Sequence, residues 1–112
     1  MEKKWRMDNQ INRLCRAIVE HKNTASPISY FELITMREYT TPDSGTEIRE
    51  IRTATEFLDQ TNVYDDAFYR IVGVYKNQSP KKTRFIGDFF DINDAKKFLY
   101  DITGETIDII SY

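Results

Sequence analysis

Cysteine and histidine occur only once each in this chain of 112 residues, as Cys15 and His21. A single cysteine excludes a disulfide within the chain and suits a reducing compartment, so we expect a cytoplasmic protein. Histidine is the usual proton-transfer group near neutral pH, and the local spacing does not pair His21 with Cys15. We therefore expect no nucleophilic catalysis and no enzyme.

The chain is also poor in glycine, with four residues, and it has no long apolar run. Neither G-x-x-x-x-G-K-[ST] nor G-x-G-x-x-G occurs, so the sequence gives no support for a nucleotide cofactor. No group of potential metal ligands has the spacing of a known site, and we expect no metal. No run of 18 apolar residues exists, and the N-terminus lacks the apolar stretch of a signal peptide. We expect no contact with a membrane.

What the sequence does contain is a pattern of strand, turn, strand and capped helix that occurs twice, over residues 30–60 and 68–104. A hairpin cannot bury its apolar face alone, and the helix that follows can cover it. The pattern predicts a single α+β domain over residues 1–112. We expect one antiparallel sheet of about five strands with the helices mainly on one face, in the order α-ββ-α-ββ-α-β.

A first helix is predicted before these two units, over residues 7–19. Its apolar residues recur at the spacing of one helix face, as Met7, Ile11, Leu14, Cys15, Ile18 and Val19. His21 falls at the end of this predicted helix, where its cation would favour the helix dipole. We interpret His21 as a solvated residue at a helix end.

The two later helices carry capping signals. Thr53 and Glu56 form a capping box, in which Thr53 accepts from the Glu56 N–H and Glu56 reaches back to the Thr53 N–H. Asp91 or Asn93 caps the last helix, and Gly104 closes it with a left-handed residue. The spacing within this helix places the side chains of Phe98 and Leu99, among others, against the sheet.

Charge is distributed unevenly, although the formal net charge is only −2. Residues 43–66 contain seven acids and two arginines, which favours a surface that attracts a charged partner. Our first hypothesis is a non-enzymatic adaptor, regulator or inhibitor that binds a protein partner, and bacterial or phage origin would suit an inhibitor of this kind. The predicted contacts are acids of this stretch and tyrosines expected to be exposed, since tyrosine is favoured at interfaces: Glu47, Glu50, Asp59, Tyr39, Tyr64 and Tyr112.

A second hypothesis concerns the basic turn between the last two long strands, which carries Lys76, Lys81, Lys82 and Arg84. Cations interleaved with aromatic residues on a hairpin can bind phosphates and stack bases. The hairpin and helix of residues 69–102 resemble those of recombinase arm-binding and plant ethylene-response DNA-binding domains, which are more basic and have a further strand. The resemblance implies nucleic-acid binding, and we assign no family from it.

A third hypothesis is an enzyme that uses scattered carboxylates. Eighteen acidic residues always offer pairs, but no pair is selected by its spacing. We expect this alternative least.

Overall fold

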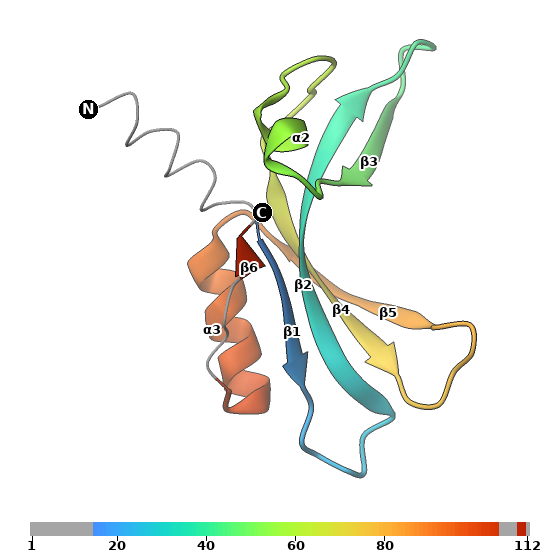
Figure 1. The fold of residues 1–112 in the computed structure, drawn as a ribbon, viewed down its shortest axis with the longest axis vertical. Helices are drawn as coiled ribbons and strands as arrows, with labels where there is room; N and C mark the ends of the chain where they lie inside the picture. The colour runs from blue at the N-terminus through green and yellow to red at the C-terminus, as the bar shows by residue number, and fades with distance from the viewer. Residues whose placement is uncertain (1–14, 106–109, 112) are drawn as a thin grey trace.

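The computed structural model describes residues 15–105 and 110–111. It is an α+β fold with one antiparallel sheet, as the sequence predicts. Along the chain, the elements are β1 (Cys15–Glu20), β2 (Ile28–Thr40), β3 (Thr46–Glu50), α2 (Ala54–Leu58), β4 (Phe68–Tyr75), β5 (Thr83–Phe89), α3 (Ile92–Thr103) and β6 (Ile110–Ser111). Figure 1 shows the strands crossing the molecule, with α3 on one side and the β2–β3 hairpin extending beyond the other strands.

The long strand β2 organises the sheet. Strands follow one another in the order β5-β4-β2-β1-β6, and β3 pairs with β2 off this path. β1 pairs with the first part of β2, where Arg16 lies opposite Ile34, and β3 pairs with the last part, where Glu50 lies opposite Met36. This register brings the end of β3 next to the start of β1, although Arg16 and Glu50 are 34 positions apart in the chain. The predicted strand at the C-terminus is confirmed only as β6, at the edge of the sheet.

The predicted helix over residues 7–19 is wrong from Cys15 onward, because Cys15–Glu20 is strand β1. Its residues 7–14 lie outside the described residues. In β1, Ala17 and Val19 are buried while Ile18 points to the opposite face and is exposed. Because side chains alternate between the faces of a strand, Ile18 and Val19 cannot both belong to one apolar stripe. The first element of the predicted order is therefore not a helix in the described part of the chain.

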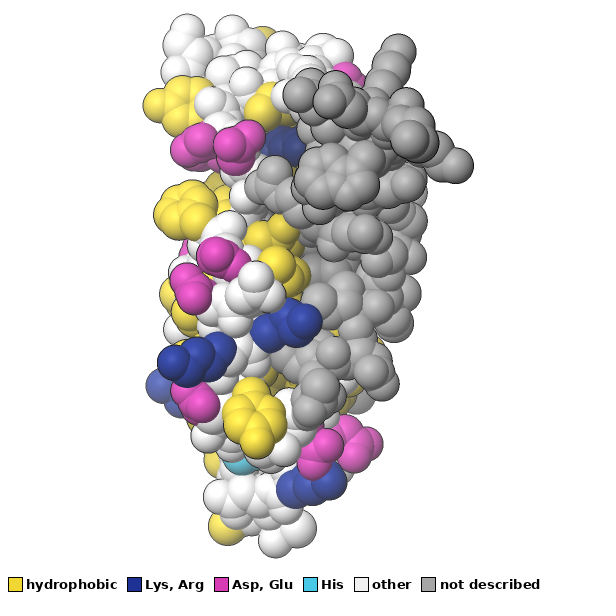
Figure 2. Space-filling view, turned by 90° about the vertical axis from the view of Figure 1, so that its left-hand side faces the viewer, with side chains coloured by type: hydrophobic (Ala, Val, Ile, Leu, Met, Phe, Trp, Pro, Cys, Tyr) yellow, Lys and Arg dark blue, Asp and Glu magenta, His cyan; other side chains and the backbone are white. Residues whose placement is uncertain are grey.

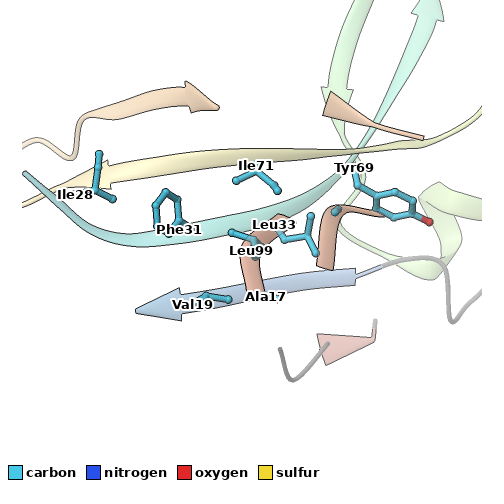
Figure 3. Close-up of a cluster of buried hydrophobic side chains, with 9 residues drawn as sticks. Ala17, Val19, Ile28, Phe31, Leu33, Tyr69, Ile71 and Leu99 are labelled. Carbon is cyan, nitrogen blue, oxygen red and sulfur yellow. The ribbon is translucent and has the colours of Figure 1, made fainter. Parts of the chain in front are cut away.

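The main core lies between the sheet and α3. Alternate residues of the strands point to this layer, and α3 adds two side chains one turn apart; the cluster is Ala17, Val19, Ile28, Phe31, Leu33, Tyr69, Ile71, Ala95 and Leu99. Figure 3 draws the side chains of this cluster, with Leu99 of α3 next to Leu33 of β2. Leu99 is buried as predicted, but the prediction for Phe98 is wrong, because Phe98 is 37% exposed and only borders the core through a ring contact with Phe89. The placement of both helices over one face of the sheet stays a prediction.

The capping signals are largely confirmed. The Thr53 hydroxyl accepts from the Glu56 N–H at 3.1 Å, which begins α2, while the Glu56 carboxylate accepts from the Arg52 N–H at 2.9 Å rather than from that of Thr53. Asp91 is the cap of α3 and accepts from the Asn93 N–H at 2.8 Å. Gly104 ends α3 with a φ of 72°, a value that glycine adopts without strain. Residues close in sequence therefore determine where both helices begin.

Candidate functional site

A groove of about 620 Å³ lies between the β2–β3 hairpin, α2 and the loop that follows α2. Its lining combines one aromatic ring with charges of both signs and two polar loop residues: Tyr39, Arg49, Glu50, Arg52, Glu56, Asp59, Thr61 and Asn62. Three of the six residues predicted to contact a protein partner, Tyr39, Glu50 and Asp59, therefore meet in one hollow. We call this hollow the β3–α2 groove.

Tyr39 forms the aromatic wall of the groove. The prediction that Tyr39 is exposed is wrong, because only 8% of it is accessible. The Cζ atom of Arg49 lies 4.0 Å from the centre of the Tyr39 ring, and the Nε atom of Arg49 lies 3.2 Å from Glu47, which is opposite Tyr39 on β3. The arginine covers the ring, since a guanidinium is attracted to an aromatic face. Glu47, a fourth predicted residue, thus neutralises the cation that covers Tyr39.

The acidic residues of the groove are held in defined positions. The Oε2 atom of Glu50 lies 3.7 Å from the Nε atom of Arg52. Hydrogen bonds from Thr61, including one from its backbone N–H at 2.9 Å, hold the pKa of the Asp59 carboxyl below its usual value. Glu56 is fixed by its bond to the Arg52 N–H. Asp59 therefore presents an ionised carboxylate to the groove near neutral pH.

Arg37 lies beneath the same wall, on β2. It is only 4% exposed, and its Cζ atom lies 4.9 Å from the centre of the Phe57 ring of α2. Its Nη1 atom approaches the backbone oxygens of Glu56 and Asp59 at 3.5 and 3.4 Å, and its Nε atom is buried with no hydrogen-bond partner within the described residues. A buried cation needs compensation, and the carbonyls at the C-terminal end of α2 supply partial negative charge. Arg37 thereby fastens α2 to the sheet.

The charged network around Glu32 crosses the opposite face of β2. Glu32 is only 2% exposed, and its carboxylate accepts from Lys81 at 2.6 Å and from Arg16 at 2.8 Å. Arg16 also lies 3.5 Å from Glu50. Burial raises the pKa of the Glu32 carboxyl, but the hydrogen bonds and positive charges of Lys81 and Arg16 outweigh it and hold the pKa below its usual value. The network joins the β4–β5 turn to the β3–α2 groove through β1.

The four cations of the basic turn do not act together. Lys81 is bound to Glu32, and the Lys76 ammonium donates to the backbone oxygen of Thr24 at 2.9 Å. Lys82 and Arg84 are exposed, beside Phe85, which is 58% exposed. Two of the four predicted phosphate contacts therefore already bind groups of this chain. The sequence alone gives no sign of such pairing, because Lys81 and Glu32 lie on segments that are far apart in the chain.

Tyr64 and His21 do not line the groove. Tyr64 is exposed and lies in the loop between α2 and β4. Its backbone N–H donates to the backbone oxygen of Glu38 at 3.0 Å. Tyr112 lies outside the described residues. His21 follows a strand rather than a helix, and its ring centre lies 5.3 Å from that of Phe31.

Figure 2 shows the side of the molecule that carries α3, where apolar, basic and acidic side chains are interspersed over the described part. No group of three or more His, Cys, Asp and Glu side chains is placed to hold a metal ion within residues 15–105 and 110–111. Among the described helices, none is long and apolar enough to cross a membrane. No family model, curated protein or solved structure matches this chain.

Proposed function

We propose that this chain is a non-enzymatic protein-interaction module of the cytoplasm, an adaptor, regulator or inhibitor, which binds a basic segment of a protein partner in the β3–α2 groove. The observation that carries the proposal is the convergence of Tyr39, Glu50 and Asp59 on one hollow. Because Arg49 covers the Tyr39 ring, the groups of the groove that a partner would meet are its carboxylates. Exposed Asp59 is suited to a segment that carries lysine or arginine, because charge complementarity favours protein interfaces.

The charge of the surroundings supports a basic partner. Residues 43–66 contain seven acids and only two bases, Arg49 and Arg52. Both arginines have acidic neighbours in the chain itself, since Arg49 pairs with Glu47 and Arg52 with Glu50. The stretch therefore keeps an excess of negative charge, which would steer a basic segment toward the groove.

Nucleic-acid binding through the β4–β5 turn is the alternative. Exposed Lys82 and Arg84 beside exposed Phe85 favour it, because single strands are bound by cations and aromatic faces. Lys81 pairs with Glu32, and Lys76 donates to the backbone oxygen of Thr24. Fewer cations are therefore available to bind phosphate than the four that the sequence places in this turn. Protein binding is the better supported of the two.

The test is affinity capture from the native host with three forms of the full chain, each with and without nuclease. The first is wild type, and the second, the groove variant, carries Asp59→Lys in the groove and Glu47→Lys at the residue that pairs with Arg49 of its lining. The third carries Asp101→Lys, a single reversal of an exposed acid on α3 that lies outside the groove. We leave Glu50 unchanged, because its contact with Arg16 is part of the fold.

We expect wild type and the Asp101 variant to capture a protein that stays bound after nuclease treatment. The groove variant should capture at least about tenfold less of that protein. Circular dichroism and thermal melting must show that the groove variant remains folded. The proposal fails if the groove variant retains every captured protein as well as wild type does. It also fails if nuclease removes all captured material, an outcome that would favour the β4–β5 turn.

A further inference from the structure

The sheet has apolar side chains on both of its faces. The face toward α3 carries the core cluster, which includes Val19, Leu33 and Ile71 (Figure 3). Side chains alternate along each strand, so the neighbours of these residues point to the opposite face, which we call the open face. Its apolar side chains are Ile18, Tyr30, Ile34, Met36, Phe68, Val72, Val74 and Phe85. A sheet face in contact with water is normally polar, so this composition is typical of a face that has a partner.

Several apolar side chains of the open face are exposed in the single chain. Ile18 of β1 is 59% exposed and Phe85 of β5 is 58% exposed. The register places these two in one row across the sheet, with one residue each of β2 and β4 between them. Phe90, which directly follows β5, is 77% exposed, and its ring centre lies 6.3 Å from that of Phe68. Exposed apolar side chains that gather on one surface mark an interaction site.

The charged side chains at the centre of the open face neutralise one another. Glu32 is bound by Arg16 and Lys81, and the Asp88 carboxylate accepts two hydrogen bonds from Arg70, at 2.9 and 3.0 Å. The ion pairs join three cations to three acids, namely Arg16, Arg70, Lys81, Glu32, Glu50 and Asp88. The centre of the face therefore has no net charge with which to select an oppositely charged partner. Two copies can meet there without repulsion, and the whole chain carries only −2.

The size of the open face reaches what a specific dimer needs. Neighbouring strands lie about 4.8 Å apart, and a strand rises about 3.3 Å per residue. With the eight residues of β4 as its length and β1, β2, β4 and β5 as its width, the face covers about 500 Å². Two such faces in contact bury about 1,000 Å², which is the lower limit for a specific interface between proteins.

We propose that two copies of this chain associate through their open faces. Sheets that pack face to face lie about 10 Å apart with their strands within about 30° of each other, so a second open face matches the first in shape and in apolar composition. Each copy supplies the same surface, as an isologous dimer requires. Ile18, Phe85 and Phe90 lose solvent contact in the dimer. The ion pairs keep the partners that they have in the single chain, so association leaves none of these charges unpaired.

The test is sedimentation velocity of the full chain over a wide range of concentration at low and high salt. We expect a monomer–dimer equilibrium that salt does not weaken, because apolar contacts rather than unpaired charges hold the copies together. Phe85→Ser and Ile18→Ser should each raise the dissociation constant by at least about tenfold, since each change removes an apolar contact twice in the dimer. Tyr100→Ser, a matched truncation of an aromatic residue that is 55% exposed on α3, should leave it unchanged.

The two open-face variants also separate this arrangement from others. Ile18 lies on β1 and Phe85 on β5, so only a contact that covers the whole face loses affinity in both. Thermal melting must show that both variants remain folded. A dimer that either variant leaves intact would overturn the proposal, and so would a chain that is monomeric at every concentration. If that monomer changes the fluorescence of Trp5, the only tryptophan, on Ile18→Ser, the occupant of the face is residues 1–14 of the same chain.

Discussion

The Glu32 network gives the sharpest prediction of stability. Glu32 is buried, and its two oxygens are divided between Lys81 and Arg16. The change Glu32→Gln keeps the shape of the side chain and removes its charge. Hydrogen bonds to charged groups contribute about 1.5–3 kcal/mol, and the loss of one partner of a buried ion pair costs about 3–5 kcal/mol.

The exposure of the two partners decides between these ranges. The side chains of Arg16 and Lys81 are 34% and 48% exposed, so both cations can reach water after Glu32 is replaced. The amide oxygen of the new glutamine side chain can still accept a hydrogen bond from one of them. We therefore expect Glu32→Gln to lower the free energy of unfolding by about 1–3 kcal/mol, below the full cost of a broken buried pair.

The two cations should not be equivalent. Arg16 contacts both Glu32 and Glu50, whereas the ion-pair partner of Lys81 is Glu32. Arg16→Met should therefore cost more than Lys81→Met, by about 1 kcal/mol. Urea unfolding followed by circular dichroism at neutral pH measures all three variants on one scale. A cost below about 0.5 kcal/mol for Glu32→Gln, or a larger loss for Lys81→Met than for Arg16→Met, would refute this account of the network.

The same structure predicts a pH dependence, two further stability changes and the outcome of a nucleic-acid binding assay. Because the pKa of Glu32 in the folded chain is below its ordinary value of 4.5, the stability difference between wild type and Glu32→Gln should be complete above that pH and should shrink as pH falls through the folded pKa. Leu99→Ala should cost about 2–5 kcal/mol in chemical denaturation because it leaves a cavity, and Phe98→Ala should cost less because Phe98 is partly exposed. Asp91→Ala should lower the free energy of unfolding by about 0.5–2 kcal/mol through loss of the α3 cap. In fluorescence anisotropy at physiological salt, wild type should show no saturable binding to single-stranded DNA or RNA; binding that falls steeply with salt and disappears with Arg84→Glu would establish the alternative function.

Local signals predicted the parts of this fold that depend on neighbours in sequence. The caps at Thr53, Asp91 and Gly104 are satisfied within a few residues, so the sequence alone is enough to find them. The prediction of a first helix was wrong because its apolar stripe included both Ile18 and Val19, whose side chains lie on opposite faces of β1. The pairing of β1 with β2 decides between helix and strand at this segment, and a window of neighbouring residues does not contain that information.

The candidate site was predictable in composition but not in geometry. The acidic excess of residues 43–66 is visible in the sequence, and it did indicate residues of the groove. Tyr39 is buried under Arg49 because of the register between β2 and β3, and this register cannot be predicted from the two residues themselves. The contact of Lys81 with Glu32 depends on where the β4–β5 turn folds back, so the sequence overestimated the number of cations available for a phosphate.

The attachment of α2 to Arg37 has a consequence for any partner of the groove. With five residues, α2 is far shorter than the roughly 12–15 residues that an isolated helix needs to persist in water. Its position depends on a guanidinium that β2 contributes from below, together with the packing of Phe57. A peptide of residues 46–64 would carry all of the groove's charged side chains without β2, the strand that holds them in place. A partner would accordingly bind this groove only while the sheet is folded. It would bind the native chain and not a chain in which β2 has detached from the sheet.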